Sequence, residues 1–230
     1  MYLYPPVVAS ANPVRSRLLA ASVFRSMKAN IYVDGFNLYY GAAKGTPYRW
    51  LDIAALCRLL LPRDQIHQIK YFTALVHPRP GDPDQKIRQQ TYLRALQTSP
   101  NLSIIYGFFL VHEVMMPLAA PNTGYAKVIK TEEKGSDVNL ATHLLTDGFQ
   151  NDYEIAVVVS NDSDLLLPIQ YVSRELKKPI GLLNPQKHPS QALLPHVQFV
   201  KQIRAGALAK CQFPPTLTDQ NGTFSKPTTW

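Results

Sequence analysis

Cysteine, charge and long apolar runs are all scarce in this sequence. It has 2 cysteines among 230 residues, and neither belongs to a Cys-x-x-Cys pair. That excludes a disulfide scaffold and a cysteine-rich zinc site, and it predicts a protein of the reducing cytoplasm. Charged residues make up 17% of the chain, against about 25% in typical soluble domains, which disfavours a coiled coil. The longest apolar runs, such as residues 155–159, fall far short of the ~20 residues that span a bilayer, so we expect no membrane partner.

The sequence motifs of several enzyme classes are missing as well. No GxxxxGK[ST], GxGxxG or GxSxG pattern occurs, which excludes a P-loop, a dinucleotide fingerprint and a serine-hydrolase elbow. Phe36 stands where haloacid-type phosphotransferases need a second aspartate. The 6 histidines are scattered and show no metal-ligand spacing. The carboxylates are therefore the residues to examine for chemistry.

What the chain does have is an uneven distribution of its net charge of +8. Residues 101–164 carry three Lys/Arg against nine Asp/Glu, whereas residues 28–100 carry ten against five and residues 165–230 carry eight against two. An acidic middle between basic flanks suits a polyanion-binding protein whose basic surface surrounds a carboxylate cluster. Ordinary solvated surface charge is the alternative, and charge alone leaves both open.

Apolar, β-branched segments alternate with helical patterns along the chain. Strands are expected at 31–33, 66–76, 102–110, 154–160 and 179–183, with a short edge strand at 197–200. Helices are expected at 37–43, 51–61, 82–98, 136–149 and 168–176, and a hairpin arm within 111–132. This alternation predicts an α/β fold with a central parallel sheet covered by helices on both faces.

The two ends of the chain differ in composition from the middle. Residues 1–27 are rich in Pro, Ala and Ser and lack acids, so we predict a flexible N-terminal extension; Met27 is an equally good natural start. The folded domain is expected over 28–213, with its motifs in 28–185. Residues 214–230 are predicted to be a polar C-terminal tail that folding does not require.

Polar side chains follow the predicted strands at the edge where parallel sheets bind ligands. Asp34 ends the first strand, Ser160, Asp162 and Asp164 follow the fourth, and Asp137 stands near the start of a helix. Carboxylates a few Å apart raise one another's pKa unless a cation neutralises them. All-oxygen ligands suit Mg²⁺ or Mn²⁺ better than zinc, so the sequence predicts a site for one of these ions.

Each acid also has a purely structural explanation. Asp34 suits a turn, Asp162 and Asp164 suit caps of the next helix, and Asp137 suits the positive end of a helix dipole. No single acid therefore indicates a metal site; only the expected meeting of these acids at one edge of the sheet does. Asp147 is excluded, because a rise of about 1.5 Å per residue places it about 15 Å from Asp137 along the same helix.

Three segments together resemble the NYN domain family of PIN-like, metal-dependent ribonucleases. They are VDGFN at 33–37, EKGSDVNLA at 133–141 and SNDSDL at 160–165. The resemblance covers roughly residues 28–185 and implies a Rossmann-like, three-layer fold with strand order 3-2-1-4-5. It also implies that acidic side chains hold Mg²⁺ or Mn²⁺ for RNA cleavage.

The residues that match the family's site positions are Asp34, Asn37, Asp137 and Asp162, and Asp164 matches a further acid. Asn161 departs from the glycine common at its position; we expect the turn to survive, because asparagine tolerates left-handed backbone conformations.

The resemblance predicts an endoribonuclease that cuts single-stranded RNA with metal-activated water. Asp34, Asp137 and Asp162 are expected to hold the ion. Among the remaining positions, Asn37 and Ser160 are expected to orient a ligand water or a phosphate oxygen, and Lys134 to meet the RNA backbone. Arg88, next to Gln89, is a substrate contact or half of a structural pair. Two alternatives stay open: an RNA-binding or regulatory protein with little turnover, and a DNA nuclease with the same chemistry.

Overall fold

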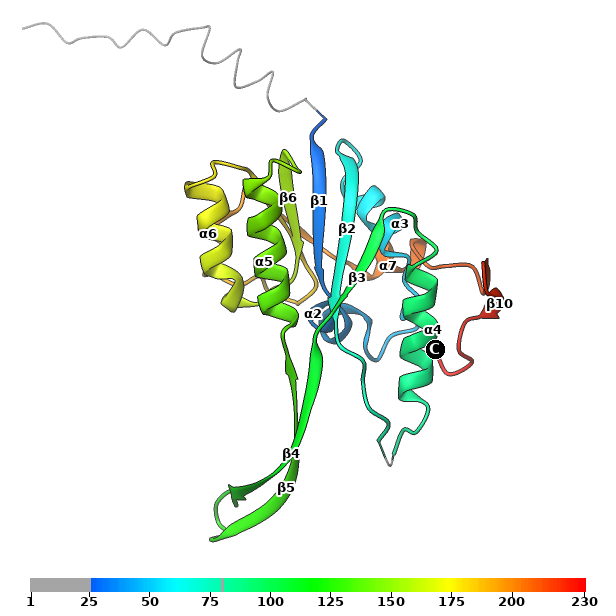
Figure 1. The fold of residues 1–230 in the computed structure, drawn as a ribbon, viewed down its shortest axis with the longest axis vertical. Coiled ribbons are helices and arrows are strands. Elements are labelled where there is room, and N and C mark those ends of the chain that lie inside the picture. Colours follow the sequence, from blue (N-terminus) through cyan, green and yellow to red (C-terminus); the bar gives the residue numbers. More distant parts are fainter. Residues whose placement is uncertain (1–25, 80) are drawn as a thin grey trace, which may run out of the picture.

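A six-stranded parallel sheet forms the centre of the molecule in the computed structural model, which describes residues 26–79 and 81–230 (Figure 1). Its strands are β1 (Lys28–Asp34), β2 (Gln65–Thr73), β3 (Leu102–Tyr106), β6 (Ile155–Val159), β7 (Ile180–Asn184) and β8 (Phe199–Gln202). Their order across the sheet is β3-β2-β1-β6-β7-β8. The predicted N-terminal extension, up to residue 25, lies outside the described residues.

The predicted α/β class is confirmed, and the strand order differs from the prediction in detail. The five predicted sheet strands correspond to β1, β2, β3, β6 and β7, which lie in the order 3-2-1-4-5 among themselves. Two hairpin strands that precede β6 in the chain stand outside this sheet, and β8 extends the sheet by a sixth parallel strand. The short edge strand begins at Phe199, two residues later than predicted.

Helices cover both faces of the sheet, as Figure 1 shows. One face carries α5 (Ser136–Phe149) and α6 (Leu166–Arg174); the other carries α3 (Ile53–Leu60), α4 (Gln85–Leu96) and the unpredicted α7 (Ala205–Lys210). Two clusters of buried apolar side chains lie between these layers. Both β6 and β7 are buried along their whole length, because helices cover them on both sides.

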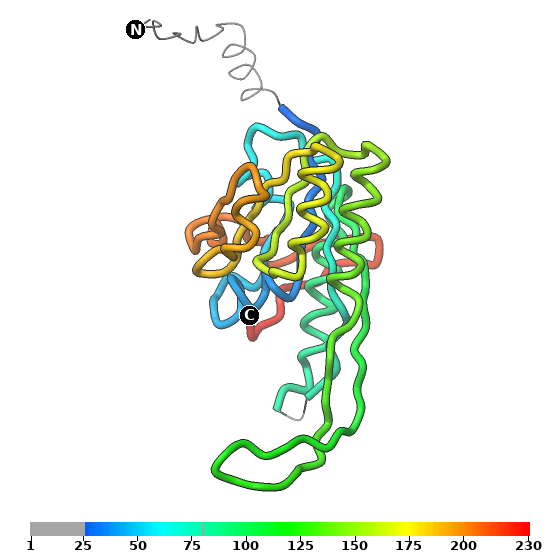
Figure 2. Tube along the Cα trace, turned by 90° about the vertical axis from the view of Figure 1, so that its left-hand side faces the viewer, coloured from blue at the N-terminus to red at the C-terminus, as the bar shows by residue number. Residues whose placement is uncertain are grey.

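A two-stranded hairpin extends away from the sheet, as Figure 2 shows from the side. It consists of β4 (Phe108–Pro117) and β5 (Tyr125–Lys134), which pair in antiparallel register along their full length. The prediction that the third strand continues to residue 110 is wrong: β3 ends at Tyr106. A Cβ atom at Gly107 would lie 2.4 Å from the carbonyl oxygen of Lys134, so only glycine allows the two backbones to meet there.

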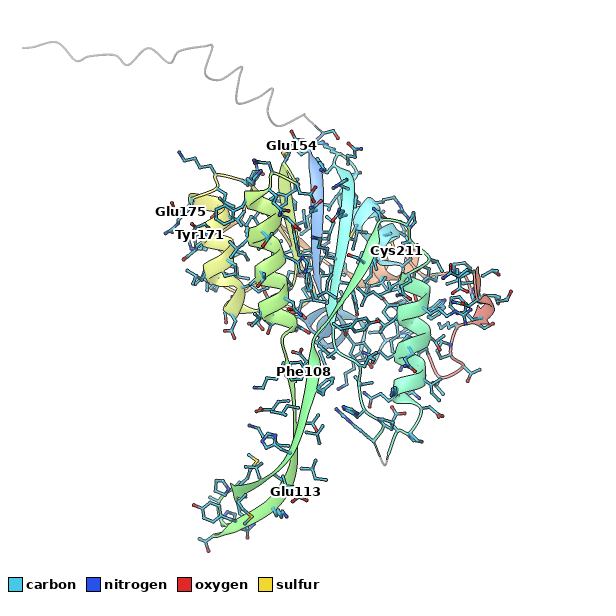
Figure 3. All side chains as sticks on the ribbon, viewed as in Figure 1. Phe108, Glu113, Glu154, Tyr171, Glu175 and Cys211 are labelled. Carbon is cyan, nitrogen blue, oxygen red and sulfur yellow. The ribbon has the colours of Figure 1, made fainter. Side chains whose placement is uncertain are left out.

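The hairpin side chains have few partners. Figure 3 shows them projecting to both sides, with Phe108 near the sheet and Glu113 farther out. Phe108 and Ile129 are 61% and 72% exposed. Because a lone hairpin has no second layer to cover it, its apolar residues stay in contact with solvent.

The C-terminal segment 214–230 is folded, which differs from the predicted polar tail. It contains the hairpin β9 (Thr216–Asp219) and β10 (Gly222–Ser225), whose Phe224 and neighbouring Leu217 lean on the core. Arg94 on α4 donates two hydrogen bonds to Asp219, of 2.8 and 2.7 Å. The ring of Trp230 lies 6.4 Å from that of Trp50 and 5.7 Å from that of Tyr92. These contacts are long-range in sequence, so local periodicity did not reveal them.

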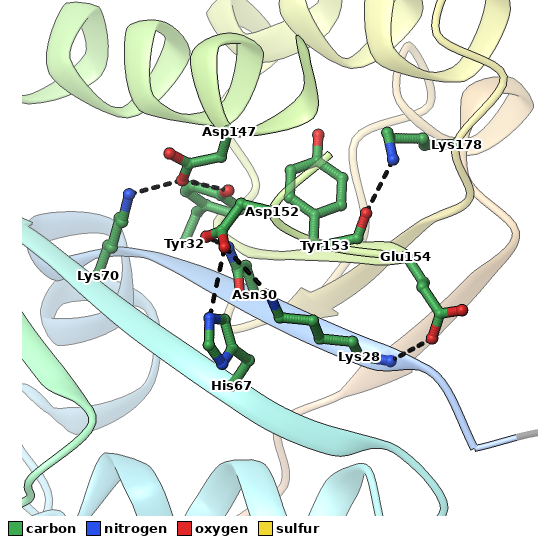
Figure 4. Close-up of polar contacts among 10 residues, drawn as sticks. All are labelled: Lys28, Asn30, Tyr32, His67, Lys70, Asp147, Asp152, Tyr153, Glu154 and Lys178. Atoms are coloured by element: carbon green, nitrogen blue, oxygen red, sulfur yellow. Dashed lines mark hydrogen bonds and ion pairs between the residues drawn. The ribbon is translucent and has the colours of Figure 1, made fainter. Parts of the chain in front are cut away.

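A polar network ties the far end of α5 to the sheet (Figure 4). The Tyr32 hydroxyl on β1 and the Lys70 ammonium on β2 both donate to Asp147, at 2.7 and 2.6 Å. Burial, together with this hydrogen bond, strongly raises the pKa of Tyr32. Asp147 is thus an internal partner of the sheet and does not belong to the acidic cluster described below, as its position on the helix predicted.

Within the described residues, no helix is both long and apolar enough to cross a bilayer.

Candidate metal centre

The carboxyl ends of β1 and β6 and the start of α5 meet at one end of the sheet. Figure 1 shows α2 (Gly35–Leu38) directly after β1 at this end, where the β4–β5 hairpin also departs. Parallel strands present their carboxyl ends on the same edge, so residues distant in sequence converge here. One carboxylate oxygen from each of Asp34, Asp137 and Asp162 lies within 4.8 Å of the others.

Asp34 is the last residue of β1, and its side chain is held at both oxygens. Oδ1 accepts a 2.9 Å hydrogen bond from the backbone N–H of Asn37, and Oδ2 accepts one of 2.9 Å from the Ser160 hydroxyl. The first bond caps α2, so the structural role expected for Asp34 as the alternative is present. Only glycine packs this closely against β2, because a Cβ atom at Gly35 would lie 2.6 Å from the Tyr71 ring and 2.7 Å from the carbonyl oxygen of Phe72.

Ser160 links two of the three acids. Its hydroxyl donates to Asp34 and accepts a 3.1 Å hydrogen bond from the backbone N–H of Asp162. Asp162 in turn accepts a 2.9 Å hydrogen bond from the N–H of Asp164, which caps a short 3₁₀ turn. Ser160 is fully buried, so its hydroxyl sets the relative position of the carboxylates; its expected contact with a phosphate or a water stays a prediction.

Asp137 comes to the cluster from the first turn of α5. Gly135 precedes this helix with a φ of +94°, a conformation that favours glycine. Burial, followed by the charges of Asp34 and Asp162, raises the pKa of Asp137 to about 6. Burial also raises the pKa of Asp34, although its two hydrogen bonds oppose the shift. Burial is the first cause of both shifts, and the repulsion of neighbouring carboxylates adds to it.

Glu133 is a fourth acid at this site, and the sequence prediction included it in a motif without giving it a role. Its Oε1 accepts hydrogen bonds from the Ser136 backbone N–H and hydroxyl, at 3.1 and 2.7 Å. Its charge contributes to the raised pKa of Asp34 and of Asp137. The order Glu133 then Ser136 is the reverse of a capping box, so local sequence gave no signal for this contact.

The donor set fits a divalent cation. Mg²⁺ binds oxygen ligands at about 2.0–2.1 Å in octahedral geometry, so oxygens on opposite sides of the ion lie roughly 4 Å apart. The three carboxylate oxygens lie within 4.8 Å of one another, so a modest approach of the side chains would bring them within reach of one ion. Asp34, Asp137 and Asp162 are therefore the residues that could hold an ion.

The other predicted site residues lie around this cluster. The Asn37 side-chain oxygen accepts a 3.1 Å hydrogen bond from the backbone N–H of Asn161, which joins α2 to the loop after β6. Asp164 is exposed at the rim, outside the group of three, though its charge still acts on Asp137. Lys134 is exposed and lies 3.2 Å from Glu132.

Asn161 keeps the loop after β6 for a reason other than the one predicted. It does not adopt a positive φ. Its side chain instead accepts a 2.6 Å hydrogen bond from the Ser190 N–H and donates one of 3.0 Å to the His188 carbonyl oxygen. The side-chain bonds stabilise the turn, so a left-handed residue is not needed there.

A cavity of about 160 Å³ adjoins the acidic cluster on the α4 side. Gly35 and Tyr71 separate the two, because both line the cavity while Gly35 directly follows Asp34. Arg88 also lines this cavity and forms an ion pair with Asp82. Its expected contact with a substrate stays a prediction. The lining is rich in aromatic side chains: Phe36, Tyr39, Tyr40, Tyr71, Tyr92 and Trp230.

Comparison with known proteins agrees with these features. A sequence profile of the NYN domain matches residues 28–201. The chain belongs to the NYN domain family. This family is nuclease-like, and the aspartate cluster of this NYN domain could bind a divalent metal ion.

A curated relative of this NYN domain carries a different kind of name. It is 6-hydroxy-3-succinoylpyridine 3-monooxygenase HspA from Pseudomonas putida strain S16, 31% identical over 237 residues, which cover 89% of this chain and 75% of the relative. Among solved structures, a protein of unknown function from Vibrio parahaemolyticus RIMD 2210633 matches with a TM-score of 0.53 and 17% identity. That match covers 79% of this chain and 95% of the Vibrio chain, and it shows the fold alone.

Proposed function

We propose that this protein is a metal-dependent endoribonuclease that hydrolyses phosphodiester bonds of single-stranded RNA. The observation that carries the proposal is the convergence of Asp34, Asp137 and Asp162 within 4.8 Å at the carboxyl edge of the sheet. Membership of a nuclease-like family supports it. The net charge of +8 supports a polyanionic substrate.

The three aspartates would hold Mg²⁺ or Mn²⁺, and the bound ion would lower the pKa of a water molecule and stabilise charge on the scissile phosphate. The chain's own part is to keep these ligands in place. Ser160 and the N–H of Asn37 hold both oxygens of Asp34, and Glu133 secures the turn that carries Asp137. Asp164 is exposed at the rim, where it could accept a proton from an attacking water.

Contacts with the RNA would come from residues around the cluster. Lys134 is exposed at the base of the hairpin and could pair with a backbone phosphate if it left Glu132. Arg88 lines the adjoining cavity. Ser160 would act indirectly by holding the Asp34 carboxylate, and Asn37 by holding the loop after β6 through Asn161. We also propose a cytoplasmic location, because both cysteines, Cys57 and Cys211, are buried and unpaired.

The test is cleavage of a labelled single-stranded RNA in Mn²⁺, beside binding of the same RNA across a salt series. Asp137→Asn and Asp162→Asn should each lower the cleavage rate by at least about 100-fold while RNA binding persists, because most affinity comes from dispersed phosphate contacts. Asp84→Asn is the matched control, since Asp84 is exposed at the start of α4 and lies outside the cluster.

Three results would overturn the proposal in different ways. A wild-type protein that binds RNA and never cuts it would be an RNA-binding or regulatory protein. Equal rates for wild type and both cluster variants would place the activity elsewhere. Faster cleavage of a matched single-stranded DNA would make it a DNA nuclease with the same chemistry.

A second candidate function is hydroxylation of a small nitrogen-containing aromatic compound. The name of the HspA relative and the aromatic cavity beside the cluster favour it. The reaction would place one oxygen atom of O₂ on the ring and reduce the other to water with two electrons and two protons from an added reductant. Incubation with 6-hydroxy-3-succinoylpyridine, ¹⁸O₂ and NADH, followed by mass spectrometry, tests it; label in the product would support it, and substrate recovered unlabelled would exclude it.

A further inference from the structure

We infer that the cavity beside the acidic cluster is a nucleobase pocket, which receives the base of the nucleotide next to the scissile phosphate and is completed by Trp230. This inference rests on the proposed ribonuclease function. It assigns a role to the C-terminal segment, which lies far from the metal-site motifs in sequence.

The position of the cavity is the first argument. Gly35 directly follows Asp34 in the chain and lines the cavity, so a proposed metal ligand and a residue of the cavity wall are neighbours in sequence. Tyr71 packs on Gly35 at this boundary. A nucleotide whose phosphate lay at the cluster would have its own base within reach of this opening.

The second argument is the size and chemistry of the cavity. Its volume is about 160 Å³, and an engineered cavity of about 150 Å³ in another protein accommodates benzene, so a flat ring fits. Aromatic walls suit base stacking, while polar groups at the edge suit hydrogen bonds to a base. Arg88 and Asp82 line it together and offer both donors and acceptors.

Arg49 supplies an unused donor at the wall. Its Nη2 donates a 2.8 Å hydrogen bond to the Thr229 carbonyl oxygen, but its Nε is buried and has no hydrogen-bond partner among the described residues. Buried N–H groups are nearly always satisfied. A carbonyl or ring nitrogen of a bound base would satisfy this one after a small shift of the guanidinium.

Trp230 closes the wall through contacts that the folded C-terminal segment provides. Its ring packs against Trp50 and Tyr92, and the Arg49 guanidinium lies 5.9 Å from its centre. The segment is fastened to α4 by the bonds between Arg94 and Asp219. The C-terminal segment thus places an aromatic side chain at a site otherwise built by α2, the segment between α2 and α3, β2 with the loop after it, and α4.

The experiment is a titration of the full chain with AMP, GMP, CMP and UMP in the presence of a chelator, followed by calorimetry. We expect at least one mononucleotide to bind and ribose 5-phosphate, which lacks a base, not to bind. Trp230→Ala should weaken this binding by about 5- to 150-fold, the range measured for removing a base-stacking aromatic residue. Arg49→Gln should weaken it by about 10-fold.

Phe224→Ala is the matched control. Phe224 belongs to the same C-terminal segment and packs on Arg94, but it does not line the cavity. It should leave mononucleotide binding unchanged within twofold. Thermal unfolding of each variant identifies any that fails to fold, and Arg49→Gln then tests the pocket independently of Trp230.

The outcomes separate this inference from the proposed function. If no mononucleotide binds while the protein cuts RNA with no base preference beside the cut, the pocket is refuted and the nuclease stands. If a mononucleotide binds without metal and RNA is never cut, the nuclease fails and the base pocket stands. If pyridine-3-carboxylate binds and mononucleotides do not, the cavity is a site for free aromatic acids and the inference is overturned.

Discussion

Replacing Asp137 by Asn should stabilise the protein when no metal is present. The pKa of Asp137 is raised from 3.8 to about 6 because the side chain is partly buried beside other carboxylates. A shift of this size corresponds to roughly 3 kcal/mol of unfavourable free energy at neutral pH if solvent did not screen it. Asp137 is half-buried, so we reduce this to about 1–2 kcal/mol.

One favourable interaction offsets part of this gain. Asp137 lies in the first turn of α5, where a negative charge stabilises a helix by about 0.3–1 kcal/mol. The net expected gain for Asp137→Asn is therefore about 1 kcal/mol, which corresponds to a rise in Tm of about 2–4 °C for a protein of this size. Mn²⁺ should raise the Tm of the wild type and raise that of the variant much less, because the variant has lost a charged ligand.

The pH dependence gives the same reasoning a second test. Between pH 4 and pH 6 the folded state binds more protons at Asp137 than the unfolded state does, since its folded pKa is the higher one. The contribution of this group to stability is therefore present at low pH and is lost as the pH rises through about 6. Asp137→Asn should remove this loss, and saturating Mn²⁺ should reduce it in the wild type.

Scanning calorimetry at pH 5 and pH 7, with a chelator or with millimolar Mn²⁺, measures the Tm of the wild type and of the Asp137→Asn variant under each of these four conditions. Asp84→Asn serves as the control and should behave like the wild type, because Asp84 is exposed and outside the cluster. A metal-free Asp137→Asn protein less stable than the wild type at pH 7, or an equal response of both proteins to Mn²⁺, would refute the claim that these carboxylates repel one another and share an ion.

Three further changes test other parts of the structure. Ser160→Ala removes the hydroxyl that joins Asp34 to the backbone of Asp162. The unfolding free energy should fall by about 1–3 kcal/mol in urea denaturation, and the affinity for Mn²⁺ should fall by about 10- to 100-fold. An unchanged Mn²⁺ affinity would contradict the positioning role of Ser160. Gly35→Ala should destabilise by about 1–3 kcal/mol, because its Cβ would lie 2.6 Å from Tyr71; wild-type stability would show that the turn can relax. Removal of residues 214–230 should lower the unfolding free energy by about 3 kcal/mol, since Trp230 then leaves the core; an unchanged Tm would restore the view of this segment as a tail.

Several features of the fold were already determined by local sequence. Runs such as residues 155–159 are too apolar for a surface strand, and their alternation with helical patterns leaves a covered parallel sheet as the consistent arrangement. The helix predicted at 136–149 has the observed bounds, Ser136–Phe149, because Gly135 and the apolar periodicity both mark it. An acid directly after a buried strand, such as Asp34, could be assigned to the carboxyl edge for the same reason.

Other features depend on contacts between distant segments, and only the tertiary structure decided them. The separation of the three carboxylates, the Ser160 hydroxyl that joins the Asp34 carboxylate to the backbone N–H of Asp162, and the nearby charge of Glu133 arise where β1, β6 and α5 meet. The division of the third predicted strand at Gly107 depends on the backbone of Lys134. Trp230 packs on residues about 140–180 positions earlier in the chain, and such pairings leave no periodic signal within any short window of sequence.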